Sequence, residues 1–449
     1  MKRLISTFII ILTLLLQTIP VFCATSPEVE AQAYILMDSR TGRVLYEHNA
    51  DTPWRPASTT KIMTALVGLK NAPLDQVMTA SHDAITDIGV GGMNIGIMTD
   101  EQMTFSDLLH ALLIVSANES ANIIAENIFS SKQEFIDEMN KTAKQLGAVN
   151  THFTNPNGID ETERDKDMFT TARDLALIAR ECMTVPEFRD IVSKKQLTNL
   201  SPTNKHSKWP VLNNTSKILG KTYTYGNAQD NSQEFTIIGV KTGSTMRAGS
   251  NYVSCAVNKE GQELISVILG VNYQPGKDVF KFTENLMRAG FENFSSQMII
   301  DRNAYIDSIT VADAADDGKI DLVTKNTIDA VLPNDRTLWN LEKKLNIKQD
   351  VVAPIKKGDI LGTIEYTENG VTIGKSDIVS TRTVDISFKA KAKNFIGNLL
   401  NNKLFKLCFI VICVIIVFLI IRFILRRISR RRRYILSRKA TYKRWKNNR

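Results

Sequence analysis

Two long apolar runs mark the ends of this chain of 449 residues. The first covers residues 4–16, contains only three hydroxyl side chains, and follows a Lys-Arg pair. A short basic start before an apolar core is typical of a secretory signal, with cleavage expected near Cys23 or Ala24. We therefore predict a signal peptide at residues 1–24, and an uncleaved N-terminal membrane helix remains the alternative.

The second apolar run covers residues 404–425 and carries charges only near its ends, at Lys406 and Arg422. A helix of this length rises about 33 Å, which is enough to cross a bilayer. Residues 407–421 offer no polar face, whereas a helix that lies on a membrane surface needs one. The pattern predicts one transmembrane helix at residues 404–425.

A basic tail follows this helix at residues 426–449. By the positive-inside rule it places the C-terminus in the cytoplasm and the body of the chain outside the cell membrane, which agrees with the signal peptide. The tail serves either as a topology determinant or as a binding segment for anionic lipid headgroups.

Between the two ends, strand-like and helix-like patterns succeed one another. Apolar positions recur at helical spacing in residues 58–70, 104–114, 121–129, 132–146, 171–181 and 279–289. Short apolar runs of strand type occupy residues 33–38, 43–48, 236–240, 251–258 and 263–271, the first two joined as a hairpin. Strands at both ends of a helical middle indicate an α+β domain over residues 25–291.

The character of the chain changes after residue 291. Short alternating runs predict strands at residues 304–311, 320–322, 327–331, 360–366, 371–378 and 383–388, with few helical signals. We expect a small all-β domain over residues 292–390. A largely polar stalk at residues 391–403 then leads to the transmembrane helix.

The net charge of +9 is concentrated at the C-terminus. Thirteen Lys and Arg residues lie between Arg422 and Arg449, so the net charge without them is −4. The main body is mildly acidic and carries no basic stripe. We therefore expect no nucleic-acid partner.

Three short motifs follow one another in the order that a single active site requires. Ser58 and Lys61 are three residues apart, so a helix places both on one face, where an amine can take the proton of the hydroxyl. The site must keep Lys61 partly neutral, by burial or by a second cation, and Lys241 is the candidate.

The second motif is Ser116-Ala117-Asn118, and the third is Lys241-Thr242-Gly243 after a strand-like run. A glycine on such a strand lets an extended substrate approach the backbone closely. Each motif is weak alone. Together, in this order and in an exported chain, they indicate a serine acyl-transfer enzyme of the kind that penicillin inhibits.

On these motifs the chain resembles the D-alanyl-D-alanine carboxypeptidases, which are low-molecular-mass penicillin-binding proteins (peptidase family S11). The resemblance covers residues 33–388. It implies an α+β transpeptidase domain of the penicillin-binding-protein and β-lactamase type, then the all-β domain and a C-terminal anchor. The matching stretches are residues 56–65, 113–121, 154–158 and 240–245, with the small-residue loop at 91–93.

The resemblance also implies a role for each catalytic residue. Ser58 attacks the carbonyl of the penultimate D-alanine in a peptidoglycan stem peptide that ends in D-Ala-D-Ala. Lys61 is the general base, and Ser116 relays a proton to the leaving D-alanine. No cofactor and no metal is implied, and β-lactam antibiotics are the expected inhibitors.

Substrate-binding roles follow from the same resemblance. Asn118 holds the substrate amide, Lys241 and Thr242 face the terminal carboxylate, and Gly243 belongs to the same motif. The backbone N–H groups of Ser58 and Ser244 form the oxyanion hole. Ser244 is itself a departure, because many relatives carry a basic or aromatic residue there.

Two other functions compete with a carboxypeptidase. A class A β-lactamase uses a Glu-x-x-x-Asn element for deacylation, and none lies between Ser116 and Lys241. A non-catalytic penicillin receptor or wall-binding module needs a broken motif, and none is broken.

The remaining polar clusters give little support to other chemistry. The five histidines are dispersed, which argues against a zinc peptidase. We expect the acidic stretch at residues 160–167 to be a solvated loop and Trp54 to be a core anchor. A single disulfide bridge, between Cys182 and Cys255, is possible.

Overall fold

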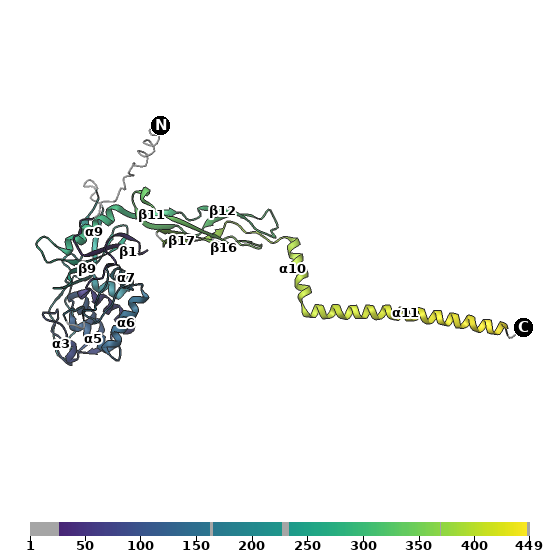
Figure 1. Cartoon of the computed structure of the whole chain (residues 1–449), viewed down its shortest axis with the longest axis horizontal. Helices are drawn as coiled ribbons and strands as arrows, with labels where there is room; N and C mark the ends of the chain where they lie inside the picture. Colours follow the sequence, from purple (N-terminus) through teal and green to yellow (C-terminus); the bar gives the residue numbers. More distant parts are fainter. Residues whose placement is uncertain (1–26, 162–164, 227–232, 369, 447–449) are drawn as a thin grey trace, which may run out of the picture. The chain divides into compact units, whose positions relative to one another are not determined.

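The computed structural model describes residues 27–161, 165–226, 233–368 and 370–446, with side chains to residue 433. The predicted signal peptide, residues 1–24, lies outside the described residues. The described chain divides into two compact units. The first contains the residues up to Ile299 with Asp329–Glu342 and Tyr366–Gly374, and the second contains the remainder (Figure 1).

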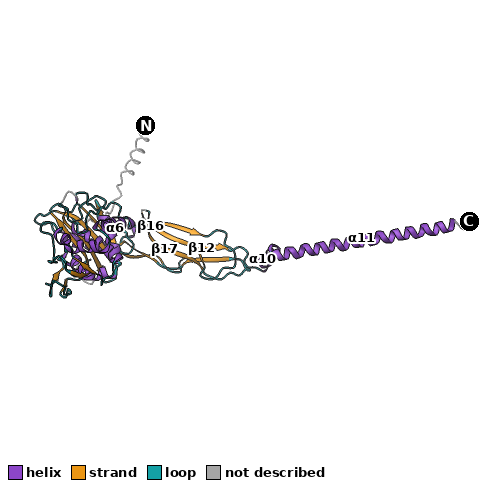
Figure 2. Cartoon of the chain, turned by 90° about the horizontal axis from the view of Figure 1, so that it is seen from below, coloured by secondary structure: helices purple, strands orange, loops and turns teal. Residues whose placement is uncertain are grey.

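A six-stranded antiparallel sheet forms the frame of the first unit, in the order β2-β1-β10-β9-β8-β7. Figure 2 draws strands in orange and helices in purple, and the first unit contains both. β9 and β10 are buried along most of their length, so they do not alternate strictly between apolar and polar residues, and β10 is apolar except for Glu263 and Ser266. The strands are β1 (Ala33–Asp38), β2 (Val44–His48), β7 (Thr222–Thr224), β8 (Glu234–Thr245), β9 (Gly249–Asn258) and β10 (Glu263–Val271).

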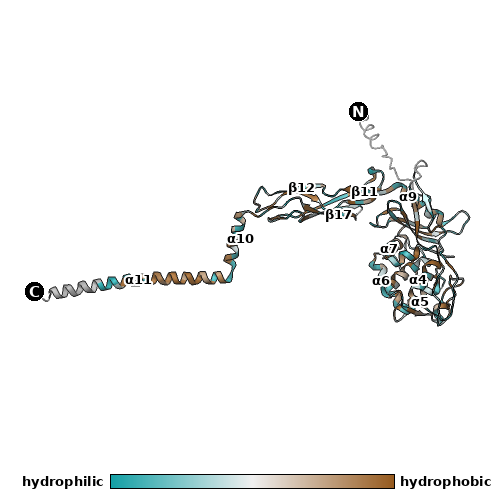
Figure 3. Ribbon diagram, turned by 180° about the vertical axis from the view of Figure 1, so that it is seen from behind, coloured by the Kyte–Doolittle hydropathy of each residue, from teal (hydrophilic) through white to brown (hydrophobic). Residues whose placement is uncertain are grey.

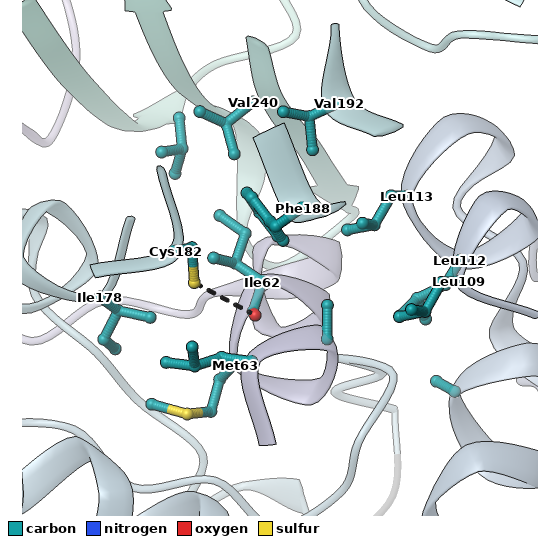
Figure 4. Close-up of a cluster of buried hydrophobic side chains, with 14 of the residues drawn as sticks. Ile62, Met63, Leu109, Leu112, Leu113, Ile178, Cys182, Phe188, Val192 and Val240 are labelled. Atoms are coloured by element: carbon teal, nitrogen blue, oxygen red, sulfur yellow. Dashed lines mark hydrogen bonds between the residues drawn. The ribbon is translucent and has the colours of Figure 1, made fainter. Parts of the chain in front are cut away.

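Helices follow in the chain between β2 and β7. They are the short 3₁₀ turn η1 (Ala57–Thr60), α2 (Lys61–Asn71), α3 (His82–Thr86), α4 (Phe105–His110), the π-helical turn η2 (Ala111–Val115), α5 (Asn118–Ile128), α6 (Lys132–Gln145), α7 (Ala172–Met183) and α8 (Pro186–Val192). Their apolar faces share one core with β9 and β10. Figure 4 shows part of this core, where Ile62 and Met63 of α2 lie among side chains of η2, α7, α8 and β8.

A second core includes α9 (Val279–Asn293) and residues of the sheet. Leu286 and Phe291 of this helix belong to the same cluster as Leu36, Phe235 and Tyr252. Helices thus contribute to two separate cores, and both cores include residues of the central sheet. The α+β fold predicted from the sequence is confirmed.

Helix starts follow the capping rule. The side-chain oxygens of Ser81, Thr104, Ser131 and Thr171 each accept a hydrogen bond from the backbone N–H three residues on. Such caps satisfy amide donors that the first turn of a helix leaves without partners.

Several element boundaries differ from prediction, and the differences lie at the motifs. The helix predicted from residue 58 begins as η1, and the regular α2 starts only at Lys61. α5 begins at Asn118, three residues before the predicted start. β8 continues through Thr245 and therefore contains the Lys-Thr-Gly motif.

Short elements escaped prediction because they carry too few periodic positions. They are α3, α8, β7, β3 (Val77–Thr79), β4 (Gln102–Thr104), β5 (Gln196–Leu197) and β6 (Leu212–Asn213).

Residues after α9 form β-structure, as predicted. β11 (Phe294–Ile300) pairs with β14 (Ile328–Pro333), and a five-stranded sheet has the order β12-β13-β17-β16-β15. Its strands are β12 (Tyr305–Thr310), β13 (Lys319–Thr324), β15 (Glu342–Ile347), β16 (Ile360–Glu368) and β17 (Val371–Ser380). β15 was not predicted, because its exposed residues give no apolar periodicity. The strand predicted at residues 383–388 is wrong: only isolated bridges form at Val384 and Ile386.

The C-terminal segment of the second unit is helical. The predicted stalk lies largely in α10 (Phe388–Asn401), which Ser387 caps, and α11 (Lys403–Lys446) follows. In the described chain one helix is long and apolar enough to cross a membrane, at Lys403–Arg433, and its most apolar 18 residues have a mean hydropathy of 3.4. Figure 3 shows its apolar first part giving way to hydrophilic residues.

The two cysteines of the main body do not pair. Cys182 and Cys255 are both buried free thiols, and burial raises the pKa of each. The sulfur of Cys182 lies 3.7 Å from the carbonyl oxygen of Ile62, on the helix that follows Ser58 (Figure 4). These thiols pack as small apolar groups inside the protein.

Candidate active site

Ser58 lies in the tight turn that opens the first long helix of the domain. Ala57, immediately before it, has φ of 49°, a left-handed conformation that costs a non-glycine residue energy. Ser58 is partly exposed, whereas Lys61 is completely buried. The lysine Nζ lies 2.9 Å from the serine Oγ, so the spacing predicted from sequence places the two groups in contact.

Three oxygen atoms surround the Nζ of Lys61. Besides the Ser58 hydroxyl, they are Oδ1 of Asn118 at 2.6 Å and the backbone oxygen of Asn157 at 2.5 Å. A neutral amine has two N–H donors and one lone pair. The two carbonyl-type oxygens can accept the two N–H bonds, which leaves the lone pair for the proton of the Ser58 hydroxyl.

The electrostatics of the site favour this neutral amine. Burial is the first cause that lowers the pKa of Lys61 well below its ordinary value, and the positive charge of Lys241 is the second. Burial also lowers the pKa of Lys241, to about 7. Glu119 acts in the opposite direction on Lys61 but is the smaller influence.

The second motif follows directly after η2. Ser116 has φ of 70°, and its Oγ is buried without a hydrogen-bond partner among the described residues. Asn118 begins α5, and its Nδ2 donates to the backbone oxygen of Ile88 at 2.8 Å while its Oδ1 accepts from Lys61. Both ends of the Asn118 amide therefore have partners within the protein.

The Lys-Thr-Gly motif lies on β8 against the turn that carries Ser58. A Cβ atom on Gly243 would lie 2.9 Å from the backbone nitrogen of Thr59 and 3.1 Å from that of Ser58. This close approach requires a glycine. Lys241 is buried, and its Nζ donates to the backbone oxygen of Thr242 at 3.0 Å.

Hydroxyl groups surround the motif. Oγ1 of Thr242 lies 2.6 Å from Oγ1 of Thr215, and Oγ of Ser244 lies 2.5 Å from the hydroxyl of Tyr273. Neither Thr215 nor Tyr273 was predicted as a site residue. Thr215 lies in a polar segment without a recognisable motif, so no local signal pointed to it.

The stretch at residues 154–158 supplies the oxygen atom that faces Lys61, a role that the sequence did not reveal. Oδ1 of Asn155 accepts hydrogen bonds from the backbone N–H groups of Asn157 and Gly158. This side-chain turn fixes the loop whose Asn157 oxygen contacts Lys61. The sequence Asn-Pro-Asn-Gly at residues 155–158 indicates a turn, but it does not indicate which residue the turn contacts.

The prediction of a solvated acidic loop at residues 160–167 is wrong for two of its residues. Asp160 and Asp165 are each 1% exposed. Asp160 Oδ2 accepts from Thr245 and lies 3.8 Å from Nε of Arg55, and Asp165 accepts from Asn155. The partners of Asp160 are distant in sequence and that of Asp165 lies ten residues earlier, so the composition of the acidic stretch itself did not reveal either contact.

Glu119, next to Asn118, is buried and anchors a neighbouring loop. Its Oε1 accepts from the backbone N–H of Ile95 at 2.6 Å. Burial raises the pKa of this carboxyl, and hydrogen bonds from the loop backbone oppose the rise. Among the described residues no cluster of three His, Cys, Asp or Glu is arranged to hold a metal ion.

Comparison with known proteins agrees with this geometry. The family model "D-alanyl-D-alanine carboxypeptidase" matches residues 21–273, and the model "Penicillin-binding protein 5, C-terminal domain" matches residues 294–385. The chain belongs to the D-alanyl-D-alanine carboxypeptidase family. Members of this serine peptidase family act on the D-Ala-D-Ala peptides of peptidoglycan and bind penicillin.

Individual relatives cover most of the chain. It is 30% identical over 396 residues to the D-alanyl-D-alanine carboxypeptidase DacF of Bacillus subtilis, covering 85% of this chain and 94% of that protein. It is 31% identical over 370 residues to DacC of Escherichia coli, covering 80% and 86%. The crystal structure of penicillin binding protein 5 from Haemophilus influenzae matches with a TM-score of 0.61 and 26% identity, covering 80% of this chain and 99% of that one.

We predict that Gly158→Ala disrupts this carboxypeptidase site. Gly158 has φ of +87°, and a Cβ atom there would lie 1.9 Å from the backbone oxygen of Ala57, next to the nucleophile. Displacing that turn by about 1 Å should lower the rate of D-alanine release about a hundredfold.

Gly261→Ala is the matched control, because Gly261 has φ of +81° but no atom within 4 Å of the added Cβ. It should cost about 1 kcal/mol of stability and leave the rate unchanged. Equal loss of activity in both variants would show that backbone strain alone, and not the contact with Ala57, is responsible.

Proposed function

We propose that this chain is a membrane-anchored serine D-Ala-D-Ala carboxypeptidase, which removes the terminal D-alanine from peptidoglycan stem peptides through an acyl-enzyme on Ser58. The observation that carries the proposal is the contact between Ser58 Oγ and the buried Nζ of Lys61. A serine becomes a useful nucleophile when a positioned base takes its proton. The lowered pKa of Lys61 supports that role near neutral pH.

Acylation follows from this arrangement. Ser58 Oγ attacks the carbonyl carbon of the penultimate D-alanine while its proton passes to Lys61. The backbone N–H groups of Ser58 and Ser244 stabilise the oxyanion. The peptide bond then breaks, and Ser116 passes a proton to the nitrogen of the departing D-alanine. The buried Ser116 Oγ, which lacks a partner within the described chain, supports this part of the proposal.

The terminal carboxylate of the substrate is assigned to Lys241 and Thr242. A protonated Lys241 attracts the carboxylate, and the hydroxyl of Thr242, with that of Thr215 beside it, can donate to it. Asn118 is assigned to the substrate amide, for which its Nδ2 must exchange its bond to Ile88. Water finally hydrolyses the ester and regenerates Ser58.

Penicillin is expected to acylate Ser58 in the same way and to remain bound. The sequence between Ser116 and Lys241 contains no Glu-x-x-x-Asn element of the kind that deacylates class A β-lactamases. Slow hydrolysis of this ester makes penicillin an inhibitor of the proposed activity rather than a substrate.

The proposed location is the outer face of the cell membrane. A cleaved signal at residues 1–24 exports the catalytic domain at 25–291 and the all-β domain at 292–390. The stalk at 391–403 and a single span at 404–425 then leave the basic tail at 426–449 in the cytoplasm. The apolar helix at Lys403–Arg433 supports this topology.

Ser58→Ala tests the mechanism. We expect the variant to release no D-alanine from diacetyl-Lys-D-Ala-D-Ala and to form no covalent adduct with a labelled penicillin, because both reactions need the same oxygen. Released D-alanine and intact-protein mass report the two activities. Labelling that persists in the variant would place the nucleophile elsewhere, and labelling of the native chain without peptide turnover would favour a penicillin receptor.

The pH profile tests the two lysines. Lys61 acts as a base only above its lowered pKa, so kcat/KM should fall as pH drops through the acidic range. Lys241, with a pKa of about 7, loses its charge as pH rises, which gives an alkaline limb beginning near pH 7.

Lys241→Arg separates the two limbs, because a guanidinium keeps its charge. It should move the alkaline limb to higher pH and leave an acidic limb in place. A flat profile from pH 4 to 7 in the native enzyme would contradict the role of Lys61 as base.

Truncation tests the membrane anchor. A chain that ends at Ser387 lacks α10, with its exposed Phe388 and Phe395, and the whole of α11. We expect a soluble enzyme that retains D-alanine release, as measured after ultracentrifugation of expressing cells. Retention of this truncated chain in the membrane fraction would mean that residues 1–24 remain as an uncleaved anchor.

A further inference from the structure

A small cationic pocket opens on the catalytic domain beside the Ser58 turn. Its volume is about 280 Å³, which suits one amino-acid side chain rather than a sugar chain. Among the described residues that line it, three are cations and none is an acid. The lining residues are Pro53, Trp54, Arg55, Lys166, Met168, Phe169 and Arg247.

The two arginines of this pocket carry more charge than the one carboxylate that contacts them among the described residues. That carboxylate belongs to Asp160, whose Oδ2 lies 3.8 Å from Nε of Arg55 and accepts from Thr245. Arg247 is exposed, and it uses Nη1 to donate to the backbone oxygen of Asp160, which carries no net charge. In the described part of the chain, Nη1 of Arg55 is buried and has no hydrogen-bond partner.

Contacts on both sides tie the pocket to the active site. Nε1 of Trp54 donates to the backbone oxygen of Ala248, directly after Arg247, at 2.8 Å. Nδ2 of Asn251 donates to the backbone oxygens of Arg55 and Pro56, which are three and two residues before Ser58. The pocket is therefore held between the turn of the nucleophile and the turn after β8.

The course of β8 indicates which part of a substrate reaches this pocket. In the proposed function, the terminal carboxylate lies at Lys241 and Thr242, and the scissile carbonyl at the N–H of Ser244. Thr245 and Arg247 come next, on the side away from the leaving D-alanine. A peptide extended along a strand advances about 3.3 Å per residue, as the strand does. The residues that precede D-Ala-D-Ala thus come level with Arg247.

We propose that Arg55 and Arg247 of this pocket bind a free carboxylate on one of the two residues that precede D-Ala-D-Ala in the stem peptide. This inference rests on the proposed function and names the substrate class of the same site. A carboxylate matches the fork of guanidinium donors that Arg55 and Arg247 present. The enzyme then prefers acidic stem peptides to the same peptides with that carboxylate amidated.

Four synthetic pentapeptides test this preference on the purified full-length chain in detergent. Two differ only in a carboxylate or a carboxamide on the residue immediately before D-Ala-D-Ala, and two differ in the same way one residue earlier. Released D-alanine gives kcat/KM for each. We expect the acid to be favoured about fivefold at one of the two positions, and this position identifies the residue that the pocket binds.

Variants of Arg247 attribute the preference to the pocket. Arg247→Gln should bring the acid-to-amide ratio close to one, Arg247→Glu should invert it, and Arg247→Lys should keep most of it. Lys221→Gln is the control, because Lys221 is an exposed cation immediately before the edge strand β7, and it should leave the ratio unchanged. The native ratio should also shrink at about 1 M salt, where exposed charges are screened.

Each outcome separates this inference from the proposed function. If no peptide releases D-alanine, the proposed carboxypeptidase itself fails. If all four peptides are hydrolysed at equal kcat/KM, the carboxypeptidase stands and the cationic pocket is overturned as a substrate site. A preference that survives in Arg247→Glu also overturns it, because the discrimination then arises elsewhere.

Discussion

The buried amine of Lys61 is the constraint on which the active site depends. Taking a lysine out of water disfavours its charged form, and the nearby charge of Lys241 adds to that effect. The neutral amine then needs two acceptors and one donor, which Asn118, Asn157 and Ser58 provide. One group thus holds together the nucleophile, the start of α5 and the loop at residues 154–158.

The surrounding fold brings these segments, which are distant in sequence, into contact. β8 reaches the Ser58 turn only because Gly243 has no side chain, and the loop at Gly158 reaches Ala57 for the same reason. Left-handed conformations at Ala57 and Ser116 lie on the two sides of the site. Each such left-handed residue costs energy, which the packing of the two apolar cores around the central sheet must offset.

Positively charged side chains lie around the Ser58 site. Burial lowers the pKa of Lys241 to about 7, and among the described residues it forms no ion pair with a carboxylate, so in the proposed function its charge is available to the substrate. Beyond the end of β8, Arg247 in the following turn and Arg55 before the Ser58 turn lie around the buried Asp160, two cations to one carboxylate. An extended acidic peptide would meet cations at both ends, with the partly exposed Ser58 between them.

The sequence by itself determined the α+β class, the long apolar C-terminal helix, most long helices and strands, and the residues of the three motifs. These features depend on periodicity and short spacing, which a chain carries locally. It did not determine that α2 starts at Lys61, that Asn157 faces this lysine, that Thr215 lies against Thr242, or that Asp160 is buried. Those facts depend on contacts between residues tens to hundreds of positions apart, and only the tertiary structure decides which polar groups meet when water is excluded.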